Sequence, residues 1–344
     1  MRPHVLVARL DNAGDVLLAG PAVRAVAARA GRVTMLCGPQ GAAAARLLPG
    51  VDEVIVHEAP WVAFEPGPLD REVTLALVDE LEALDLDQAI ILTSFHQSPL
   101  PLALLLRLAG VPFVAATSVD YPGSLLDVRH RIDDDVHEVQ RSLGLVGAIG
   151  YELPTGDDGR LAVLRSTEYP PPVDEDETYV VVHPGVSVSA RAWAPERHAA
   201  LVDALVAEDR RVVVTGGPRE RHLTDRVAGP PRSGVVNLGG KTDLVGLAEV
   251  IAAAEAIVVG NTGPAHLAAA VGTPIVSLFA PSVPAVRWRP WRVPHVLLYK
   301  DVPCAGCRAR VCPIEGHPCL GGVTVDEVLA ALNRLAPIRA GAAR

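Results

Sequence analysis

Short apolar runs rich in β-branched residues alternate with stretches of helical spacing, and this alternation occurs twice along the chain. In the first half, the expected strands are His4–Leu10, Val33–Cys37, Val54–His57, Ala89–Thr93 and Pro112–Ala116. In the second half, they are Tyr179–His183, Arg211–Thr215, Val235–Leu238, Ala256–Val259 and Ile275–Phe279. Helical patterns such as Val16–Ala30 and Arg71–Leu84 separate these runs. The alternation predicts an α/β protein whose parallel sheets are covered by helices on both faces.

A Pro-rich acidic segment separates the two series of strands. With 344 residues, the chain is long for a single core, so two domains are expected. We predict a first Rossmann-like domain over 1–165, a linker over 166–178, a second Rossmann-like domain over 179–324, and a closing helix, Val325–Leu335, with a tail to 344. The carboxyl ends of the two parallel sheets are expected to border a cleft.

The charge distribution disfavours some partners. The whole net charge of −9 lies in the first half, because residues 1–165 contain 13 arginines, no lysine and 22 acidic side chains. This disfavours nucleic acid as a partner, and also electrostatic docking on an anionic bilayer. The first residues carry charge too early for a signal peptide, and the apolar stretch Pro99–Val119 is interrupted by Arg107 and by prolines. A cytoplasmic protein is expected, with at most peripheral contact at the inner face of the plasma membrane.

The segment Val258–Pro274 has the pattern of a phosphate-binding turn. Its β-branched run ends in Gly260-Asn-Thr-Gly263, and a helix is expected to open at Pro264, a residue favoured at the first helical position. A helix N-terminus behind such a turn offers backbone N–H groups and a positive dipole end. His266 could add a donor. These residues predict an anionic ligand, most simply a nucleoside diphosphate.

A second candidate site follows the first expected strand, in Leu10–Leu18. Asp15 is expected near the carboxyl edge of the sheet, where a carboxylate can accept the proton of an acceptor hydroxyl. The alternative is that Asp15 caps the helix. Asn12 and Gly14 are candidates for the acceptor side, although Asn12 also suits a simple turn.

A third group of candidates follows the strands at Tyr179 and Arg211. Ser187 and Ser189 could bind phosphate oxygens, and Arg191 could clamp a diphosphate, although an Arg close to a Trp is often a packing residue. Further on, the spacing of Thr215-Gly-Gly-Pro does not match a dinucleotide fingerprint, which disfavours hydride transfer. Glu220 could accept hydrogen bonds from a ribose, or it could be an ordinary glutamate in the first turn of a helix.

Four of the five cysteines lie close together near the C-terminus. Cys304, Cys307, Cys312 and Cys319 could bind a structural zinc ion or an iron–sulfur cluster, with His317 as a substitute ligand. Disulfide pairing and free thiols are equal alternatives. No acidic pair resembles a catalytic divalent-cation site, because Asp133–Asp135 is expected to begin a helix over Val136–Leu143.

Taken together, these motifs resemble glycosyltransferase family 9, which includes the ADP-heptose:lipopolysaccharide heptosyltransferases. The resemblance rests on Val5–Leu18, Pro21–Arg24, His183–Gly185, Arg191–Glu196, Gly260–Leu267 and Val271–Pro274, and extends to the cysteine cluster and closing helix. It implies a GT-B fold, in which the first Rossmann-like domain binds the acceptor and the second binds the sugar nucleotide. It also implies Asp15 as general base, Arg191 at the donor phosphate, Glu220 at the ribose, and Thr262, Gly263 and His266 at the diphosphate.

The resemblance implies inverting transfer of heptose or a related sugar, without a catalytic metal or other cofactor. ADP-heptose is the expected donor, and a hydroxyl of a cell-envelope glycan or glycolipid is the expected acceptor, as in lipopolysaccharide biosynthesis. Asn261 stands where the family usually has Asp, which leaves the donor sugar open. The acidic first half lacks the basic surface suited to phosphorylated lipid A. Alternative functions are those of a nucleotide-sugar epimerase, a non-catalytic nucleotide-sugar-binding protein and a metal-binding interaction module.

Overall fold

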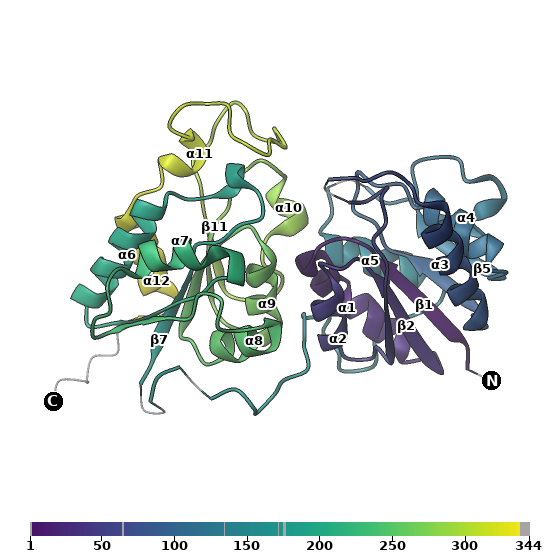
Figure 1. Ribbon diagram of the computed structural model, residues 1–344, viewed down its shortest axis with the longest axis horizontal. Coiled ribbons are helices and arrows are strands. Elements are labelled where there is room, and N and C mark those ends of the chain that lie inside the picture. The colour runs from purple at the N-terminus through teal and green to yellow at the C-terminus, as the bar shows by residue number, and fades with distance from the viewer. Residues whose placement is uncertain (1, 64, 134, 171, 175–176, 338–344) are drawn as a thin grey trace. The chain divides into compact units, whose positions relative to one another are not determined.

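The chain forms two compact units, Met1–Leu164 and Arg165–Arg344, each built around its own parallel sheet (Figure 1). The computed structural model describes residues 2–63, 65–133, 135–170, 172–174 and 177–337. Within these residues, no helix is both long and apolar enough to cross a bilayer.

The first unit contains a six-stranded sheet in which all neighbouring strands are parallel. Its order is β3 (Glu53–Val56), β2 (Arg32–Cys37), β1 (His4–Arg9), β4 (Gln88–Ile91), β5 (Phe113–Thr117) and β6 (Val128–His130). The central strand β1 is apolar from Val5 to Ala8, and these residues are fully buried. Such a continuous apolar run fits a strand with helices on both faces.

Five helices cover the two faces of this sheet. They are α1 (Ala13–Ala27), α2 (Ala42–Leu47), α3 (Arg71–Ala83), α4 (Leu100–Leu108) and α5 (Glu138–Ala148), with the short 3-10 helix η1 at Gly123–Leu125. Leu6 and Ala8 pack in one cluster with Leu81 of α3 and Leu106 of α4. Because side chains alternate along a strand, Val5 and Val7 face the opposite layer, where α1 packs against α2 and α5.

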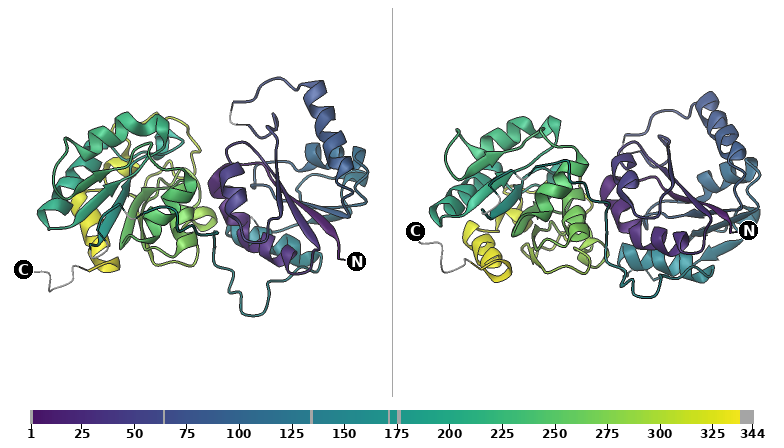
Figure 2. Two further views of the ribbon diagram at one scale, coloured as in Figure 1. Left: turned by 60° about the horizontal axis from the view of Figure 1, so that its bottom comes forward. Right: turned by 90° about the horizontal axis from the view of Figure 1, so that it is seen from below.

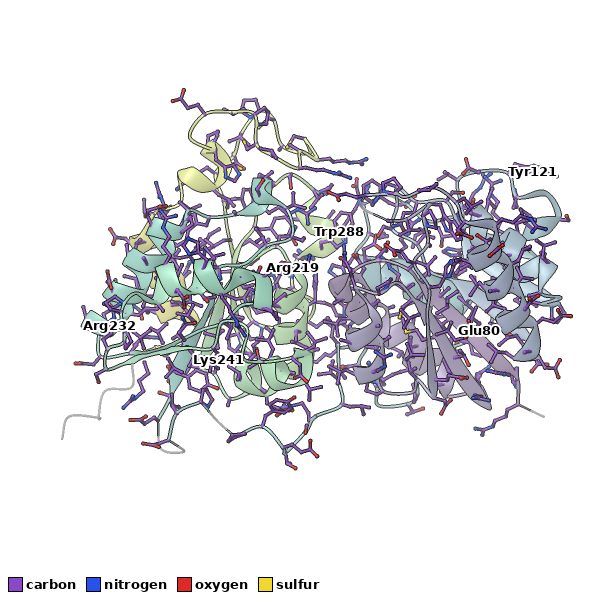
Figure 3. The ribbon with its side chains drawn as sticks, in the orientation of Figure 1. Glu80, Tyr121, Arg219, Arg232, Lys241 and Trp288 are labelled. Atoms are coloured by element: carbon purple, nitrogen blue, oxygen red, sulfur yellow. The ribbon has the colours of Figure 1, made fainter. Side chains whose placement is uncertain are left out.

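The second unit repeats this architecture. Its sheet has the order β12 (His295–Leu298), β11 (Ile275–Leu278), β10 (Ala256–Gly260), β7 (Tyr179–His183), β8 (Arg211–Val214) and β9 (Val235–Asn237). Its helices are α6 (Pro195–Ala207), α7 (Arg221–Ala228), α8 (Leu244–Ala252), α9 (Gly263–Val271), α10 (Ala285–Trp288), α11 (Pro318–Gly321) and α12 (Val325–Leu335), with 3-10 turns η2 (Ser189–Arg191) and η3 (Pro218–Glu220). Figure 2 shows the layers of each unit from two further sides, and Figure 3 the side chains that fill them.

Both sheets have the doubly wound strand order 3-2-1-4-5-6 of the Rossmann fold when their strands are numbered within each unit. In such a sheet, the loops leave in opposite directions at the point where the order reverses, and ligands bind there at the carboxyl ends of the strands. This point lies between β1 and β4 in the first unit and between β7 and β10 in the second. The loops after these four strands are therefore the places to look for a site.

All ten expected strands are present, with ends shifted by at most two residues, but two edge strands were missed. These are β6 and β12, whose residues are only partly buried, so they lack the buried apolar signature of the inner strands. The structure also corrects three helix starts. Helix α1 begins at Ala13 rather than Val16. Helix α5 begins at Glu138 rather than Val136, and Asp134 lies outside the described residues.

The third correction concerns α9, which begins at Gly263, so that Pro264 is its second residue. The expected closing helix has the predicted bounds, Val325–Leu335. It is not a separate appendage, because Val328, Ala331 and Leu332 are buried in the core of the second unit. The final residues of the expected tail, 338–344, lie outside the described part of the chain.

The segment that follows the first unit is fastened to α8. The guanidinium of Arg165 pairs with the carboxylate of Glu249 at 2.6 Å and lowers the pKa of that carboxyl group below its usual value. The hydroxyl of Tyr169 donates to Asp243 at 2.6 Å, and its ring lies directly over Gly246, where a Cβ atom would collide with it. The first described residues of the expected linker therefore pack on the second unit.

Candidate active site

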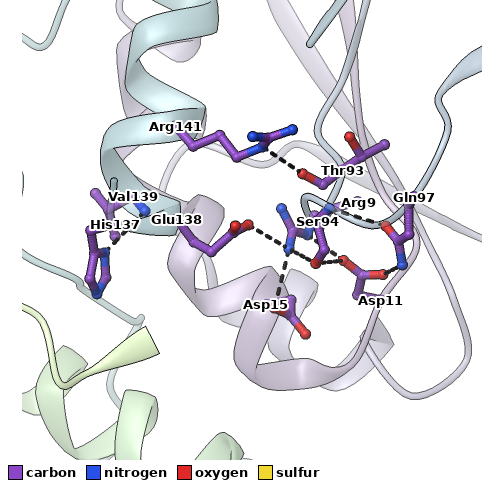
Figure 4. A network of polar contacts seen from close by, with 10 residues as sticks. All are labelled: Arg9, Asp11, Asp15, Thr93, Ser94, Gln97, His137, Glu138, Val139 and Arg141. Atoms are coloured by element: carbon purple, nitrogen blue, oxygen red, sulfur yellow. Dashed lines mark hydrogen bonds and ion pairs between the residues drawn. The ribbon is translucent and has the colours of Figure 1, made fainter. Parts of the chain in front are cut away.

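A buried arginine organises the carboxyl edge of the first sheet. Arg9, the last residue of β1, is only 1% exposed. Its Nε lies 2.8 Å from Asp11 Oδ2, and its Nη2 lies 3.1 Å from Asp15 Oδ1 and 3.2 Å from Glu138 Oε2 (Figure 4). Burial by itself would lower the pKa of Arg9, but the three carboxylates raise it above its usual value. The guanidinium is therefore a fixed positive charge among three acids.

The loop after β4 completes this network. The hydroxyl of Ser94 accepts a hydrogen bond from Arg9 Nη2 at 2.8 Å and donates to Asp11 Oδ2 at 3.0 Å. The side-chain amide of Gln97 donates to the other oxygen of Asp11. Both oxygens of Asp11 are thus held by side chains, which makes Asp11 a structural part of the turn (Figure 4). The network ties β1 to β4 where the strand order reverses.

Asp15 is the most accessible carboxylate of the three. Its side chain is 20% exposed, compared with 6% for Asp11 and 1% for Glu138. It lies in the first turn of α1, and the residue at the N-cap position is Asn12, so the helix-capping alternative for Asp15 is wrong. Asn12 is exposed and Gly14 is buried. A partly exposed carboxylate in the first turn of a helix, oriented by Arg9, is placed where it can accept a proton.

In the second unit, the loops after β7 and β8 hold Glu220. His183, at the end of β7, is hydrogen-bonded through Nδ1 to Thr215 Oγ1 at 2.9 Å. Burial lowers the pKa of His183, and nearby Glu220 only partly opposes this, so the imidazole is neutral. Glu220 accepts the backbone N–H of Gly217 at 2.7 Å. A Cβ atom at Gly185 would collide with the Glu220 carboxylate, so glycine is required there for this close approach.

The turn that carries Arg191 lies against the end of β10. A Cβ atom at Gly260 would lie 2.7 Å from Val186 and 3.6 Å from the carbonyl oxygen of Arg191. The loops after β7 and β10 therefore meet where the order of the second sheet reverses, as expected for a ligand site. Ser187 is exposed. Ser189 is engaged within the protein, because its hydroxyl donates to the carbonyl of Arg310 at 3.0 Å.

The turn predicted to bind phosphate joins β10 to α9. Thr262 occupies the N-cap position but makes no side-chain cap, and Gly263 is the first helical residue. Asn261 is 5% exposed, and its side-chain Nδ2 has no hydrogen-bond partner among the described residues. His266, in the first turn of α9, is also buried. A buried donor without a partner costs roughly 1–3 kcal/mol, which a ligand oxygen would recover.

The four clustered cysteines form no disulfide bond. All four cysteines are free thiols, and together with His317 they line a cavity of about 20 Å³. In the part of the chain that the structure describes, no three or more His, Cys, Asp or Glu side chains are arranged to hold a metal ion. A structural zinc ion bound by this cluster stays a prediction.

Sequence reasoning missed the network around Arg9. Arg9 could have been found, because a charged residue closes an otherwise apolar strand and must pair when buried. Glu138 and Ser94 gave no such signal. They reach Arg9 from 129 and 85 residues away in sequence, and only the sheet order brings them together.

These observations define a class of protein. Two doubly wound parallel units in one chain are the GT-B architecture of glycosyltransferases. A family model for glycosyltransferase family 9 (heptosyltransferase) matches residues 74–317. The chain belongs to glycosyltransferase family 9.

Curated relatives match over part of their length. Lipopolysaccharide heptosyltransferase 3 of Escherichia coli is 30% identical over 168 residues, which cover 47% of this chain and 48% of the relative. Lipopolysaccharide heptosyltransferase 1 of Pseudomonas aeruginosa is 31% identical over 183 residues, covering 52% and 49%. The chain thus spans about half the length of the curated relatives it matches.

Solved structures match over nearly the whole chain. The family 9 glycosyl transferase of Veillonella parvula has a TM-score of 0.77 with 18% identity, covering 98% of both chains. The ADP-heptose heptosyltransferase II of E. coli has a TM-score of 0.74 with 20% identity, covering 97% of this chain and 98% of that one. The E. coli heptosyltransferase WaaC with ADP has a TM-score of 0.68 with 20% identity, covering 98% and 100%. These similarities establish the fold.

Proposed function

We propose that this protein is an inverting glycosyltransferase that transfers heptose or a related sugar from a nucleoside diphosphate sugar to a hydroxyl of a cell-envelope glycan or glycolipid. The observation that carries the proposal is the close approach of the Arg191 backbone to Gly260, because it brings the loop that carries this arginine to the turn between β10 and α9 at one edge of the second sheet. The relatives support ADP-heptose as the first donor to test, since two matched structures contain ADP or an ADP-heptose analogue.

The second unit would hold the donor through its diphosphate. Negative charge develops on the departing nucleoside diphosphate during transfer, and fixed positive groups stabilise it. Arg191 and the N-terminus of α9 supply such groups. Glu220 would accept a ribose hydroxyl. Because these groups can neutralise the leaving diphosphate, we propose that transfer needs no divalent cation, and activity is expected to survive treatment with EDTA.

The first unit would activate the acceptor. Asp15 takes the proton of the acceptor hydroxyl as the oxygen attacks the anomeric carbon, and the bond from that carbon to the diphosphate oxygen breaks. The transition state is oxocarbenium-like, as in other glycosyl transfers. Attack from the face opposite the leaving group inverts the anomeric centre. Arg9 orients Asp15 through the contact of its Nη2 with Asp15 Oδ1.

The acceptor is proposed to carry few phosphate groups. The first unit contains the whole net negative charge of the chain, so it would repel a strongly anionic glycolipid. A neutral or weakly charged envelope glycan fits this surface better than phosphorylated lipid A. Transfer to such a glycan is expected to be less sensitive to salt than transfer to heptose-free lipopolysaccharide.

A nucleotide screen followed by turnover tests the proposal. Isothermal titration with ADP, UDP, GDP and dTDP is expected to show one preferred nucleotide, and the matching sugar nucleotide should release that diphosphate when an acceptor is added. Binding without turnover on any acceptor would instead identify a non-catalytic nucleotide-sugar-binding protein. Absence of binding to all four nucleotides would reject the donor site.

A further inference from the structure

The segment Val302–Cys319, here named the cysteine loop, is fastened to the two turns that border it. Its only well-buried residue is Cys319, and Val311 is 72% exposed, so a hydrophobic core does not fix its path. Backbone hydrogen bonds do so instead. Gly306 N–H donates to the carbonyl of Pro281 at 2.7 Å, and Arg308 N–H donates to that of Ser282 at 2.9 Å. Loops of this length without secondary structure of their own are usually functional or disordered, and this one is tied down.

The cysteine loop also forms hydrogen bonds with Ala190, the residue that precedes Arg191. Ala190 N–H donates to the carbonyl of Arg310 at 3.0 Å, and the carbonyl of Ala190 accepts a hydrogen bond from His317 Nε2 at 3.0 Å. Ser189 donates its hydroxyl to the same Arg310 carbonyl. The carbonyl of Ala190 belongs to the planar peptide group that contains the nitrogen of Arg191. His317 and the Arg310 backbone therefore set the direction in which the Arg191 side chain leaves the turn.

The thiols lie on the side of the loop that faces this turn. Cys304, Cys307, Cys312 and Cys319 line a cavity whose wall also includes Ala190 and Ser282. The cavity has a volume of about 20 Å³, which accommodates at most a single water molecule. Cys319 is buried, and Cys304 and Cys312 are partly buried, so a group added to one of these three sulfur atoms presses on the wall of the cavity, to which Ala190 belongs.

We propose that the cysteine loop is a positioning element of the donor site: it fixes the Ala190–Arg191 peptide for diphosphate binding, and modification of its thiols weakens that binding. The proposal rests on the proposed function, because it assumes that Arg191 contacts the donor phosphate. His317 acts through the Ala190 peptide and is a positioning residue. The loop thereby gives the transferase a thiol-dependent donor affinity.

The first test replaces the imidazole that holds the turn. His317→Ala is expected to weaken ADP binding about fivefold, as for the loss of one hydrogen bond, with a smaller change in the melting temperature than Arg9→Met causes. His317→Gln keeps a side-chain N–H donor and is expected to restore most of the affinity. Equal ADP affinity in wild type and His317→Ala would overturn the proposal, as would a loss in His317→Ala that His317→Gln does not recover.

The second test modifies the thiols of the wild-type protein with iodoacetamide at pH 7.5. The fifth cysteine, Cys37, is an internal control: it is buried in β2, and burial raises its pKa to about 11, so it stays unreactive. Mass spectrometry counts the modified loop cysteines, and ADP affinity is expected to fall at least about fivefold once they react. Modification of the accessible Cys304, Cys307 and Cys312 with unchanged ADP affinity contradicts the proposal.

Arg191→Ala distinguishes failure of the proposed donor site from failure of the positioning role of the cysteine loop. If ADP affinity falls in Arg191→Ala but not in His317→Ala or in the alkylated protein, the cysteine loop has no positioning role and the proposed function stands. If Arg191→Ala binds ADP as well as the wild type does, the donor site itself is wrong, and the positioning role is rejected with it.

Discussion

Arg9 Nη2 lies 3.1 Å from Asp15 Oδ1, and this contact joins an almost completely buried cation to a partly exposed carboxylate. The two residues stand six positions apart, on either side of the turn from β1 to α1. Arg9 is in turn held by Asp11, Glu138 and Ser94. Asp15 is therefore a partly exposed carboxylate whose orientation is set from inside the protein.

The first prediction concerns Arg9. Arg9→Lys keeps the positive charge, but a lysine ammonium lacks the planar N–H groups with which the guanidinium contacts three carboxylates. The rate of transfer is therefore expected to fall about tenfold. ADP affinity should not change, because Arg9 lies in the first unit. Arg9→Met leaves buried carboxylates unpaired and is expected to lower the free energy of unfolding by about 3–5 kcal/mol. Steady-state kinetics and urea unfolding check both outcomes, and full activity in Arg9→Lys would contradict the positioning role.

The second prediction concerns the donor phosphate. Arg191→Ala is expected to weaken ADP binding by about tenfold or more, since it removes a charge-assisted hydrogen bond, and Arg191→Lys should recover part of the loss. Arg232 offers a matched control on the surface of the second unit (Figure 3), where it pairs with Asp203 at 2.5 Å. Arg232→Ala should bind ADP like the wild type. Calorimetric titration makes the comparison, and equal losses in the two variants would point to general electrostatics.

The third prediction concerns Asn261. Its Nδ2 has no protein partner in the described part of the chain, so Asn261→Ala should cost little stability but weaken binding of the sugar nucleotide. Asn261→Asp replaces this donor with a charged acceptor and should change which sugar nucleotide binds best. Parallel titrations with ADP and ADP-heptose separate a sugar contact from a phosphate contact. If Asn261→Ala loses stability and keeps its affinity, the amide has a structural role instead.

The fourth prediction concerns pH. His198 in α6 packs edge-on against the indole of Trp193, with ring centroids 4.9 Å apart. Burial, reinforced by His183, lowers the pKa of His198 to about 3. The folded protein thus holds His198 neutral, whereas the unfolded chain binds a proton below about pH 6.5. The stabilisation is complete above that pH and is lost as the pH falls toward 3, by about 2 kcal/mol between pH 7 and pH 5.

His198→Phe provides the comparison for this effect, because phenylalanine keeps an aromatic ring beside Trp193 and cannot titrate. The free energy of unfolding of wild type should fall more than that of His198→Phe over the same pH interval. Parallel slopes for the two proteins would mean that His198 is not the group responsible.

Much of the fold could be predicted from the sequence because buried parallel strands leave a clear signature. The runs around Val5–Ala8 and Val180–Val182 are continuous and apolar, and each is followed by a turn and a helix. Edge strands such as β6 and β12 carry a weaker signature, since water reaches one side. The helix starts were misplaced by one to three residues because a cap depends on local geometry that several neighbouring residues could provide.

The site residues that directly follow a strand could be predicted from the sequence. Contacts between residues far apart in the sequence could not. Asp15, Arg191 and the Asn261–Gly263 turn each directly follow a strand, so the order of the elements places them at a sheet edge. Ser189 was expected at a phosphate, but the structure directs its hydroxyl to Arg310, 121 residues away. The contacts of the cysteine loop with Ala190 were hidden in the same way, because they depend on the tertiary fold alone.

Asp15→Asn tests the proposed role of Asp15 as the general base of glycosyl transfer. The measurement is ADP release from ADP-heptose in the presence of heptose-free lipopolysaccharide or a neutral envelope glycan, alongside ADP affinity by titration. The wild type is expected to release ADP with formation of glycosylated product. Asp15→Asn should bind ADP with the same affinity and lose transfer by at least about 100-fold. Transfer by Asp15→Asn at the wild-type rate would contradict the account.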